Sequence, residues 1–455
     1  MSATENTLIT DFTHGNITGK LYRFAFPLFL SSLLQVVYNI VDMIVVGRIM
    51  GKIGLSAVAV GGDVSNFLTF LAMGFCNAGQ VIISQYIGAG RRNDLGRFIS
   101  TMFTSLIVCA LGMSALCLVF REPILRLMNT PSEAFSEALA YSSICIAGSV
   151  FIYGYNIVSA VMRGMGDSKH PFVFVALASV LNIILDIIFV VGMGMGAAGA
   201  AYATVASQGI SFLLCGVFIL RNKEKYSLSI RVKDFFRPDF SMLASLAKLG
   251  VPMAIKSASI HFSKLFVNSW INSYGVAVSA FAGVAAKLSS VSNLISNSLN
   301  TAGSSMVGQN IGARKYERVP KIMKSVFLTV IAISTLMSVV ILVFPEAIFS
   351  VFTTDSAVMT VAMEYLPVAV LMFYGSAARA PMNAFLNGSG NYRINFVTAM
   401  LDGIVMRIGL SVLFGVAMSL GYMGFWLGDA LAGFTPLWIG IVFYIKGNWR
   451  KKLEA

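Results

Sequence analysis

The chain contains 455 residues, of which 57% are hydrophobic and only 12% are charged, and its mean hydropathy is +0.79. Soluble domains carry about 25% charged residues, so this composition excludes a soluble protein and indicates an integral membrane protein. The formal net charge of +13 does not indicate a nucleic-acid partner, because the basic residues lie in short loops between apolar runs.

Apolar segments separated by charged or glycine-rich breaks predict twelve membrane-spanning helices. Each has the roughly 20 residues that are needed to cross a bilayer. The spans are 21–47, 54–87, 95–119, 134–162, 171–193, 198–220, 242–273, 278–308, 319–344, 357–386, 393–416 and 422–446. The predicted fold is an all-α integral membrane protein with an N-terminal six-helix lobe at 1–221, a cytoplasmic linker at 222–240 and a C-terminal six-helix lobe at 241–455.

Three sequence signatures recur at a nearly constant spacing, which indicates an internal duplication. Six spans in each half is an even number, so the halves share one topology, and we expect a pseudo-two-fold axis along the membrane normal. Two such halves usually carry a solute across the bilayer. The signatures are Gln85-Tyr-Ile-Gly88-Ala89 with Gln309-Asn-Ile-Gly312-Ala313 and Gly164-Met-Gly166-Asp167 with Gly388-Ser-Gly390-Asn391, both 224 residues apart, and Pro27 with Pro252, 225 apart.

The distribution of basic residues predicts the orientation of the chain. Most of the arginines and lysines follow the even-numbered spans, whereas the opposite loops hold only Arg48, Lys52, Arg121 and Arg126. Because loops rich in basic residues stay in the cytoplasm, we expect both termini to be cytoplasmic.

Two acidic residues lie inside spans of the first half. Asp42 and Asp186 each precede the outer end of their helix by about six residues, hence by roughly 9 Å. Tyr38 and Asn182 lie four residues before them on the same helix faces, and Thr204 enters the next span at a similar depth. These oxygens suit a proton or a sodium ion, with Asp42, Asp186 and Asn182 as the metal ligands. The alternative is that the acids only hydrogen-bond between helices.

The membrane-embedded ionisable residues of the second half are mainly basic, so we place ion coupling in the first half. Lys256 and Lys264 either extend toward the ends of their helix or contact anionic groups of a substrate. Asp402 and Arg407 are expected to be structural partners. The candidates for a substrate cavity are Gln35, Asn39, Lys256, His261, Lys264 and Arg379.

Pro27 and Pro252 lie within apolar runs, where each removes a helical hydrogen bond and permits a bend. A bend at Pro27 would move Asp42 when its protonation changes. The alternative is a static kink.

The sequence contains no catalytic pattern that we recognise, so we expect no enzyme and no organic cofactor. His14, His170 and His261 are scattered, and neither a nucleophile elbow nor a Walker motif occurs. Gly164–Asp167 has the G-x-G-D pattern of intramembrane aspartyl proteases, but its repeat ends in Asn391.

The chain resembles the multidrug and toxic compound extrusion (MATE) transporters from Pro27 to the last span. The segments that carry this resemblance are Tyr38-Asn-Ile-Val-Asp42 with Val46-Gly47-Arg48, Gln85-Tyr-Ile-Gly-Ala-Gly-Arg91, Arg163-Gly-Met-Gly-Asp167 with Pro171, Asn182-Ile-Ile-Leu-Asp186, Gly194-Met-Gly196 through Thr204, and Gln309-Asn-Ile-Gly-Ala-Arg314.

The resemblance implies a monomeric multi-pass exporter in the bacterial inner (cytoplasmic) membrane, surrounded by lipid. It would expel amphipathic, often cationic, drug-like compounds by alternating access, driven by sodium or proton influx. The five candidate residues of the first half match ion-site positions of the DinF-like branch, and Asn156 matches a further one. The other branch carries a glutamate on the seventh helix, where this chain has Lys256 and His261.

Three other functions fit the sequence less well. The nearest is a flippase or exporter of lipid-linked precursors or anionic metabolites within the same superfamily, which would suit a basic second half. A major-facilitator transporter would carry a different basic motif after its second helix. A membrane enzyme would need a convergent catalytic set.

Overall fold

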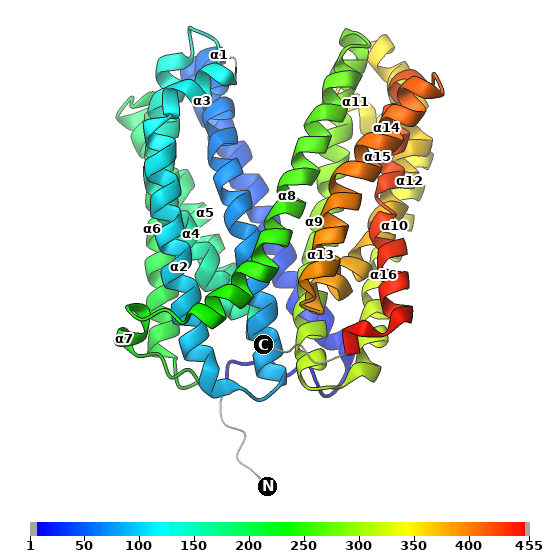
Figure 1. Ribbon diagram of the computed structural model, residues 1–455. Coiled ribbons are helices and arrows are strands. Elements are labelled where there is room, and N and C mark those ends of the chain that lie inside the picture. Colours follow the sequence, from blue (N-terminus) through cyan, green and yellow to red (C-terminus); the bar gives the residue numbers. More distant parts are fainter. Residues whose placement is uncertain (1–6, 129, 451–455) are drawn as a thin grey trace. The chain divides into compact units, whose positions relative to one another are not determined.

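The computed structural model describes residues 7–128 and 130–450, and every regular element in these ranges is helical. The extreme termini, which we expect in the cytoplasm, lie outside the described residues. The chain divides into two compact units. The first contains Phe26–Gly250 together with the residues up to Asp11, and the second contains Phe12–Ala25 and Val251 onward. Figure 1 shows that long helices make up both units.

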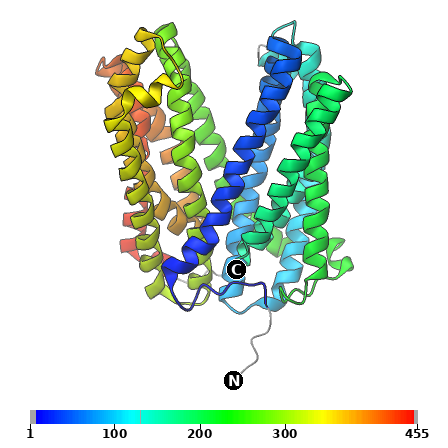
Figure 2. The ribbon, with the colours of Figure 1, turned by 180° about the vertical axis from the view of Figure 1, so that it is seen from behind.

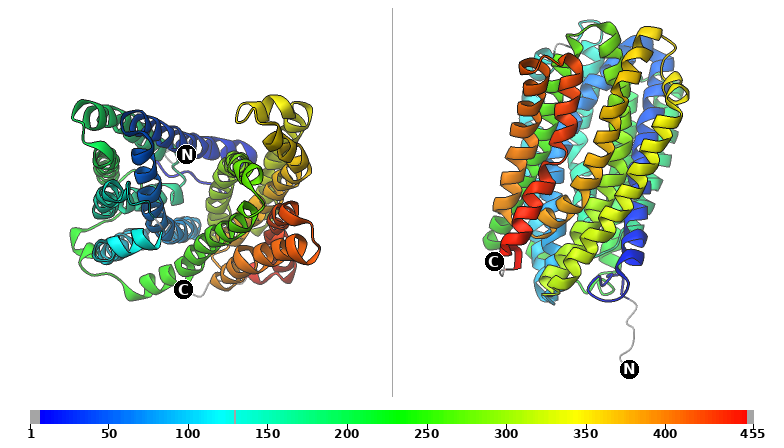
Figure 3. Two further views of the ribbon diagram at one scale, coloured as in Figure 1. Left: turned by 90° about the horizontal axis from the view of Figure 1, so that it is seen from above. Right: turned by 90° about the vertical axis from the view of Figure 1, so that its right-hand side faces the viewer.

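The helices of the first unit correspond to the first six predicted spans. Its central helices α2, α4 and α6 pack side by side (Figures 1 and 3). The elements are α1 (Ile17–Gly88), α2 (Arg92–Val119), α3 (Arg121–Leu127), α4 (Phe135–Gly164), α5 (Lys169–Asp186), the π-helical turn η1 (Ile187–Gly192), α6 (Gly196–Arg221) and α7 (Val232–Phe235).

The second unit repeats this order, and its core is rich in aromatic side chains such as Phe281, Tyr365 and Trp426. Its elements are α8 (Phe240–Asn272), α9 (Val276–Gly312), η2 (Tyr316–Arg318), α10 (Val319–Val343), α11 (Pro345–Ser350), α12 (Ser356–Gly388), α13 (Tyr392–Met400), η3 (Leu401–Val405), α14 (Met406–Val412), η4 (Leu413–Ala417), α15 (Gly421–Ala432), α16 (Thr435–Lys446) and η5 (Asn448–Arg450).

The all-helical prediction is confirmed. The element α1 contains two helices that meet at a kink at Gly51, with a φ of 60°, and these correspond to the spans predicted at 21–47 and 54–87. Figure 2 shows the first part of α1 as a continuous dark blue ribbon. Ten helices of the described chain are long and apolar enough to cross a membrane. The α8 helix is not among them, because polar residues such as Lys256 lower its hydropathy.

Two helices carry the chain between the units, and each has a proline next to the crossing. The boundary lies between Ala25 and Phe26 in α1 and between Gly250 and Val251 in α8. Pro27 and Pro252 follow these crossings within two residues. The structure keeps helical geometry through both prolines.

The repeated glycine motif has the same structural role in both units. A β-carbon on Gly164 would lie 2.9 Å from the Gln80 carbonyl oxygen, and one on Gly388 would lie 2.7 Å from that of Ser304. Only glycine permits such close packing of helices. Asp167 completes the first motif structurally, because Tyr226 and His170 both bond to its carboxylate, at 2.5 and 2.6 Å.

Between two pairs of corresponding glycines, the second unit has one residue more than the first. Glycines with positive φ at 166 and 390 are 224 residues apart, whereas those at 196 and 421 are 225 apart. The π-helical turns η1 and η4 correspond at the longer spacing, which leaves η3 without a counterpart in the first unit. A π turn accommodates one extra residue, so η3 is the inserted turn, and it contains Asp402.

Candidate ion and substrate sites

The structure places both acids of the first unit in buried positions. Asp42 lies in α1, and Asp186 is the last residue of α5, directly before the π turn η1. Their exposed fractions are 6% and 0%. The charge of Asp42 acts on Asp186, so the fold brings the two carboxyl groups into electrostatic range of each other.

Neutral polar groups surround this pair of acids. The Asn182 side chain donates to the Thr204 hydroxyl at 3.4 Å, and Tyr38 interacts with Gln208 and lies within the field of Asp42. Tyr38, Asn182 and Thr204 thus each interact with another polar side chain near the predicted ion site. Gln208 was not predicted. Its position one helical turn after Thr204 is the signal that would have identified it.

Four buried oxygen atoms at this site have no hydrogen-bond donor in the described structure. They are Oδ1 of Asp42, Oδ1 of Asn182 and both carboxylate oxygens of Asp186. Buried acceptors are almost always paired, because an unpaired polar group loses its hydration without compensation. Among the described residues, no three His, Cys, Asp or Glu side chains lie together so that they could hold a metal ion. The arrangement therefore has the capacity to bind a proton or one hard cation through carboxylate and amide oxygens.

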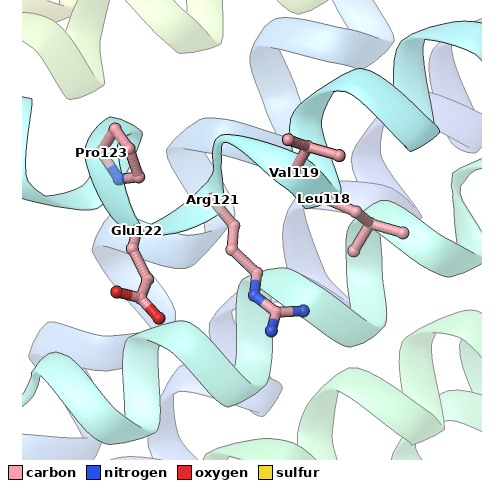
Figure 4. A pocket seen from close by; sticks show the side chains of 5 residues that line it. All are labelled: Leu118, Val119, Arg121, Glu122 and Pro123. Carbon is pink, nitrogen blue, oxygen red and sulfur yellow. The ribbon is translucent and has the colours of Figure 1, made fainter.

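No described hydrogen bond joins the other predicted residues of the first unit to this set. Asn156 donates to the carbonyl of Ile152 in its own helix, at 2.8 Å. Gln35 is half-buried and Asn39 is exposed. A surface pocket between α2 and α3 contains none of the predicted residues (Figure 4). It is lined by Leu118, Val119, Arg121, Glu122 and Pro123.

The second unit contains a network of charged side chains. Asp402 bonds to Arg379 at 3.1 Å and lies 3.5 Å from Arg407, which also pairs with Asp429. Lys256 donates to the Asn383 side-chain oxygen at 2.6 Å. The sequence predicted the partnership of Asp402 and Arg407. It did not predict Asn383, although this residue lies one turn after Arg379.

Two other candidates lie next to this network. Lys264 is half-buried and interacts electrostatically with Asp429 and Arg407. His261 is exposed and lies within the field of Lys264.

Comparison with known proteins identifies the family. The MatE family model matches residues 27–188 and 252–413, one match in each half. This chain belongs to the MatE family. It is 30% identical over 440 residues to the "Probable multidrug resistance protein YpnP" of Bacillus subtilis, covering 97% of both chains.

Solved structures show that the MatE fold extends over the whole chain. A multidrug resistance MATE family transporter in an outward-facing conformation matches with a TM-score of 0.90 at 22% identity, covering 99% of this chain and 100% of that one. A MOP superfamily transporter from Pyrococcus furiosus, described as having a binding pocket of reverse polarity, matches with a TM-score of 0.88 at 22% identity and the same coverage. MatE proteins are multidrug transporters, so the chain is a multi-pass membrane transporter rather than an enzyme.

Proposed function

We propose that this MatE transporter is a secondary active antiporter that exports amphipathic, drug-like compounds in exchange for sodium ions or protons by alternating access. It acts as a monomer in the bacterial inner membrane, with lipid around it and both termini in the cytoplasm. The multidrug resistance relatives support the drug-like substrate, and the related outward-facing structure supports a cycle with more than one conformation.

The four unpaired buried oxygens of the first unit carry the proposal of ion coupling. Desolvated carboxylates are costly in a membrane, and binding a proton or a sodium ion removes that cost. The coupling site consists of Asp42, Asp186 and Asn182, with Tyr38, Thr204 and Asn156 in supporting roles. Pro27 and Pro252 permit the helix bending that links ion binding to the state of the transporter.

The proposed substrate path includes Gln35 and Asn39 in the first unit and Lys256, His261, Lys264 and Arg379 in the second. Ion and substrate must prefer different conformations, because a ligand shifts an equilibrium only through its differential affinity for the two states. For the Pyrococcus furiosus transporter, the reverse polarity of the pocket is said to suggest a different function.

The test is efflux of ethidium from proteoliposomes under a sodium gradient and, separately, under a proton gradient. We expect one gradient to drive efflux and Asp42→Asn to abolish it. Asp94→Asn is the matched control, because Asp94 forms an exposed ion pair with Arg91 far along the chain from the site.

Efflux that persists in Asp42→Asn would contradict the proposed coupling. Efflux lost equally in Asp94→Asn would show that the loss is not specific to the site. An absence of dye movement under both gradients would shift the substrate toward anionic or lipid-linked compounds.

A further inference from the structure

Basic side chains outnumber acidic ones in the charged network of the second unit. Among the described residues, the acids that interact with Lys256, Lys264, Arg379 and Arg407 are Asp402 and Asp429, which gives the network a formal excess of two positive charges. Asp402 and Arg407 are almost fully buried, with exposed side-chain fractions of 0% and 2%. Unbalanced charge in a membrane is costly, so an excess of this kind requires an explanation.

The contacts within the network leave several of its donors unused. Lys256 is 8% exposed, and its described partner is the neutral side-chain oxygen of Asn383. Nε of Arg379 and Nε of Arg407 are buried without a hydrogen-bond acceptor in the described structure, and Nη2 of Arg407 lies 3.5 Å from the Asp402 carboxylate. A guanidinium donates in a fixed fork that matches a carboxylate or phosphate. The unused donors are therefore suited to an anionic group.

The first unit shows that the fold itself does not need these charges. At the equivalent spacing, Arg407 corresponds to Asn182 and Asp429 to Thr204, so an ion pair in one unit replaces an amide–hydroxyl hydrogen bond in the other. Lys256 corresponds to Ser31. The same helices thus pack in the first unit with neutral residues at these three positions.

The position of Asp402 gives a second, independent indication. It lies in the inserted turn η3, which is absent from the first unit, and its Oδ2 atom is buried without a partner. Inserted π turns are frequent at functional sites. The turn is closely packed, because a β-carbon on Gly403 would lie 2.6 Å from Ser259 in α8. This insertion brings the Asp402 carboxylate to Arg379 and Arg407 and so holds the two guanidinium groups in place.

We propose that the second unit binds an anionic group, a carboxylate or phosphate, through Lys256, Arg379 and Arg407. Arg379 and Asp429 are 21% and 29% exposed, so the network is accessible at one side. Asp402 positions the arginines, and Asn383 positions Lys256. The inference rests on the proposed export function, and it adds amphipathic compounds that carry an acidic group to the substrates of this transporter.

The test measures binding without transport, by calorimetry on the full chain in phosphatidylcholine nanodiscs. The probes are naphthylacetate, which is anionic, and the related naphthylethanol and naphthylmethylamine, which are neutral and cationic. We expect the anion to bind at least about tenfold more tightly than the other two probes, because one charge-assisted hydrogen bond contributes a difference of this size in the dissociation constant. Equal affinity for the anion and the neutral alcohol would overturn the proposal.

Two variants test the residues in different ways. Lys256→Gln removes a charge, and Asn383→Asp keeps Lys256 but supplies an internal carboxylate that competes for it. Both are expected to weaken anion binding about tenfold. Lys256→Arg should retain most of it. Lys248→Gln is the matched control, because Lys248 is exposed and lies two turns earlier in the same helix.

Unchanged anion affinity in Asn383→Asp, or the same loss in Lys248→Gln, would refute the site even if Lys256→Gln fails to fold. Nanodiscs with added phosphatidylglycerol distinguish the source of the anion. Competition by this lipid in the wild type but not in Asn383→Asp supports a lipid headgroup, and lack of competition supports a soluble amphipath. Anion binding without gradient-driven efflux would refute only the antiport, whereas efflux without anion binding would refute only this site.

Discussion

At the residue scale, Asp186 is a buried acid whose position destabilises the fold and is expected to serve transport. Its carboxyl group is fully buried, and neither oxygen has a donor in the described structure. A residue selected for packing alone would not remain in this state, because the cost of burying the carboxylate is not offset by hydrogen bonds. The side chain is explained best by a ligand that binds and leaves.

Asp186→Asn is therefore expected to abolish gradient-driven efflux while leaving the melting temperature of the detergent-solubilised protein equal or higher. The amide has nearly the same shape and removes the buried charge. Efflux and thermal unfolding, measured on the same preparation, check both parts. A marked fall in melting temperature would instead support the view that Asp186 only stabilises helix packing.

Asp239 is a half-buried acid in the linker before α8, and its role is structural. It precedes α8 and accepts hydrogen bonds from the Ser241 hydroxyl at 2.7 Å and from the backbone N–H groups of Ser241 and Met242 at 2.8 and 3.2 Å. These bonds, that of the Ser241 hydroxyl first, hold the pKa of Asp239 below its usual value. The carboxylate thus caps the start of the helix.

Asp239→Ala should lower the free energy of unfolding by about 1 kcal/mol at neutral pH. Because the folded-state pKa is lowered, this contribution is complete above the unfolded pKa of about 3.9 and is lost as the pH falls through the folded value. Unfolding experiments from pH 7 down to about pH 3 should show the wild type and the variant converging. Asp239→Asn, which retains an acceptor oxygen, should lie close to the wild type at pH 7, and a constant gap at all pH values would contradict this assignment.

At the scale of elements, the duplicated glycines determine how closely the helices approach. Gly388 of α12 packs against α9, where a β-carbon would lie 2.7 Å from the Ser304 oxygen and 2.8 Å from Val307. Gly164 of α4 makes the corresponding contact with Gln80 and Ile83 in the first unit. The motif is therefore a packing device that both units inherited.

Gly388→Ala should destabilise the protein by about 1–3 kcal/mol, because the backbones must separate to admit the methyl group. Gly283→Ala provides the matched control, since a β-carbon there meets nothing within 4 Å and alanine favours the helix. Thermal unfolding of the two variants gives the comparison. Equal melting temperatures would show that the contact at Gly388 is not limiting.

The sequence predicted the apolar helices and the buried acids, but it did not predict the roles of neutral polar residues. The helices were recognisable because a bilayer demands long apolar runs, and Asp42 and Asp186 were recognisable because a membrane acid is exceptional. Gln208 and Asn383 were missed, because neutral polar residues are common inside helices and only their neighbours show their role.

At the scale of the whole molecule, the two helices that pass between the units each have a proline near the crossing. Proline weakens a helix by removing one backbone hydrogen bond, so bending costs less there. A motion of one unit relative to the other would act on α1, on α8 and on the segment at Asp11 and Phe12, where the chain also passes between the units. We therefore expect α1 and α8 to bend near these prolines during a conformational cycle.

Pro252→Ala is expected to raise the melting temperature and to slow efflux, because the restored hydrogen bond stiffens α8 at the crossing. Pro367→Ala serves as control, since Pro367 lies within α12 and inside a single unit. It should stabilise in the same way without slowing transport. Initial rates of dye efflux at saturating gradient provide the measurement, and equal rates for Pro252→Ala and wild type would exclude bending at this proline as a slow step.

The sequence by itself determined the membrane class, the duplication, the helix content and the positions of the two acids. These follow from hydropathy, period and the cost of burying charge, which are local properties of the chain. Only the tertiary structure decided that the four acceptor oxygens lack donors and that Lys256 pairs with a neutral amide. It also decided that an inserted turn brings Asp402 to two arginines. The reason is physical: whether a buried polar atom is paired depends on residues distant in the chain, which only the packed helices bring together.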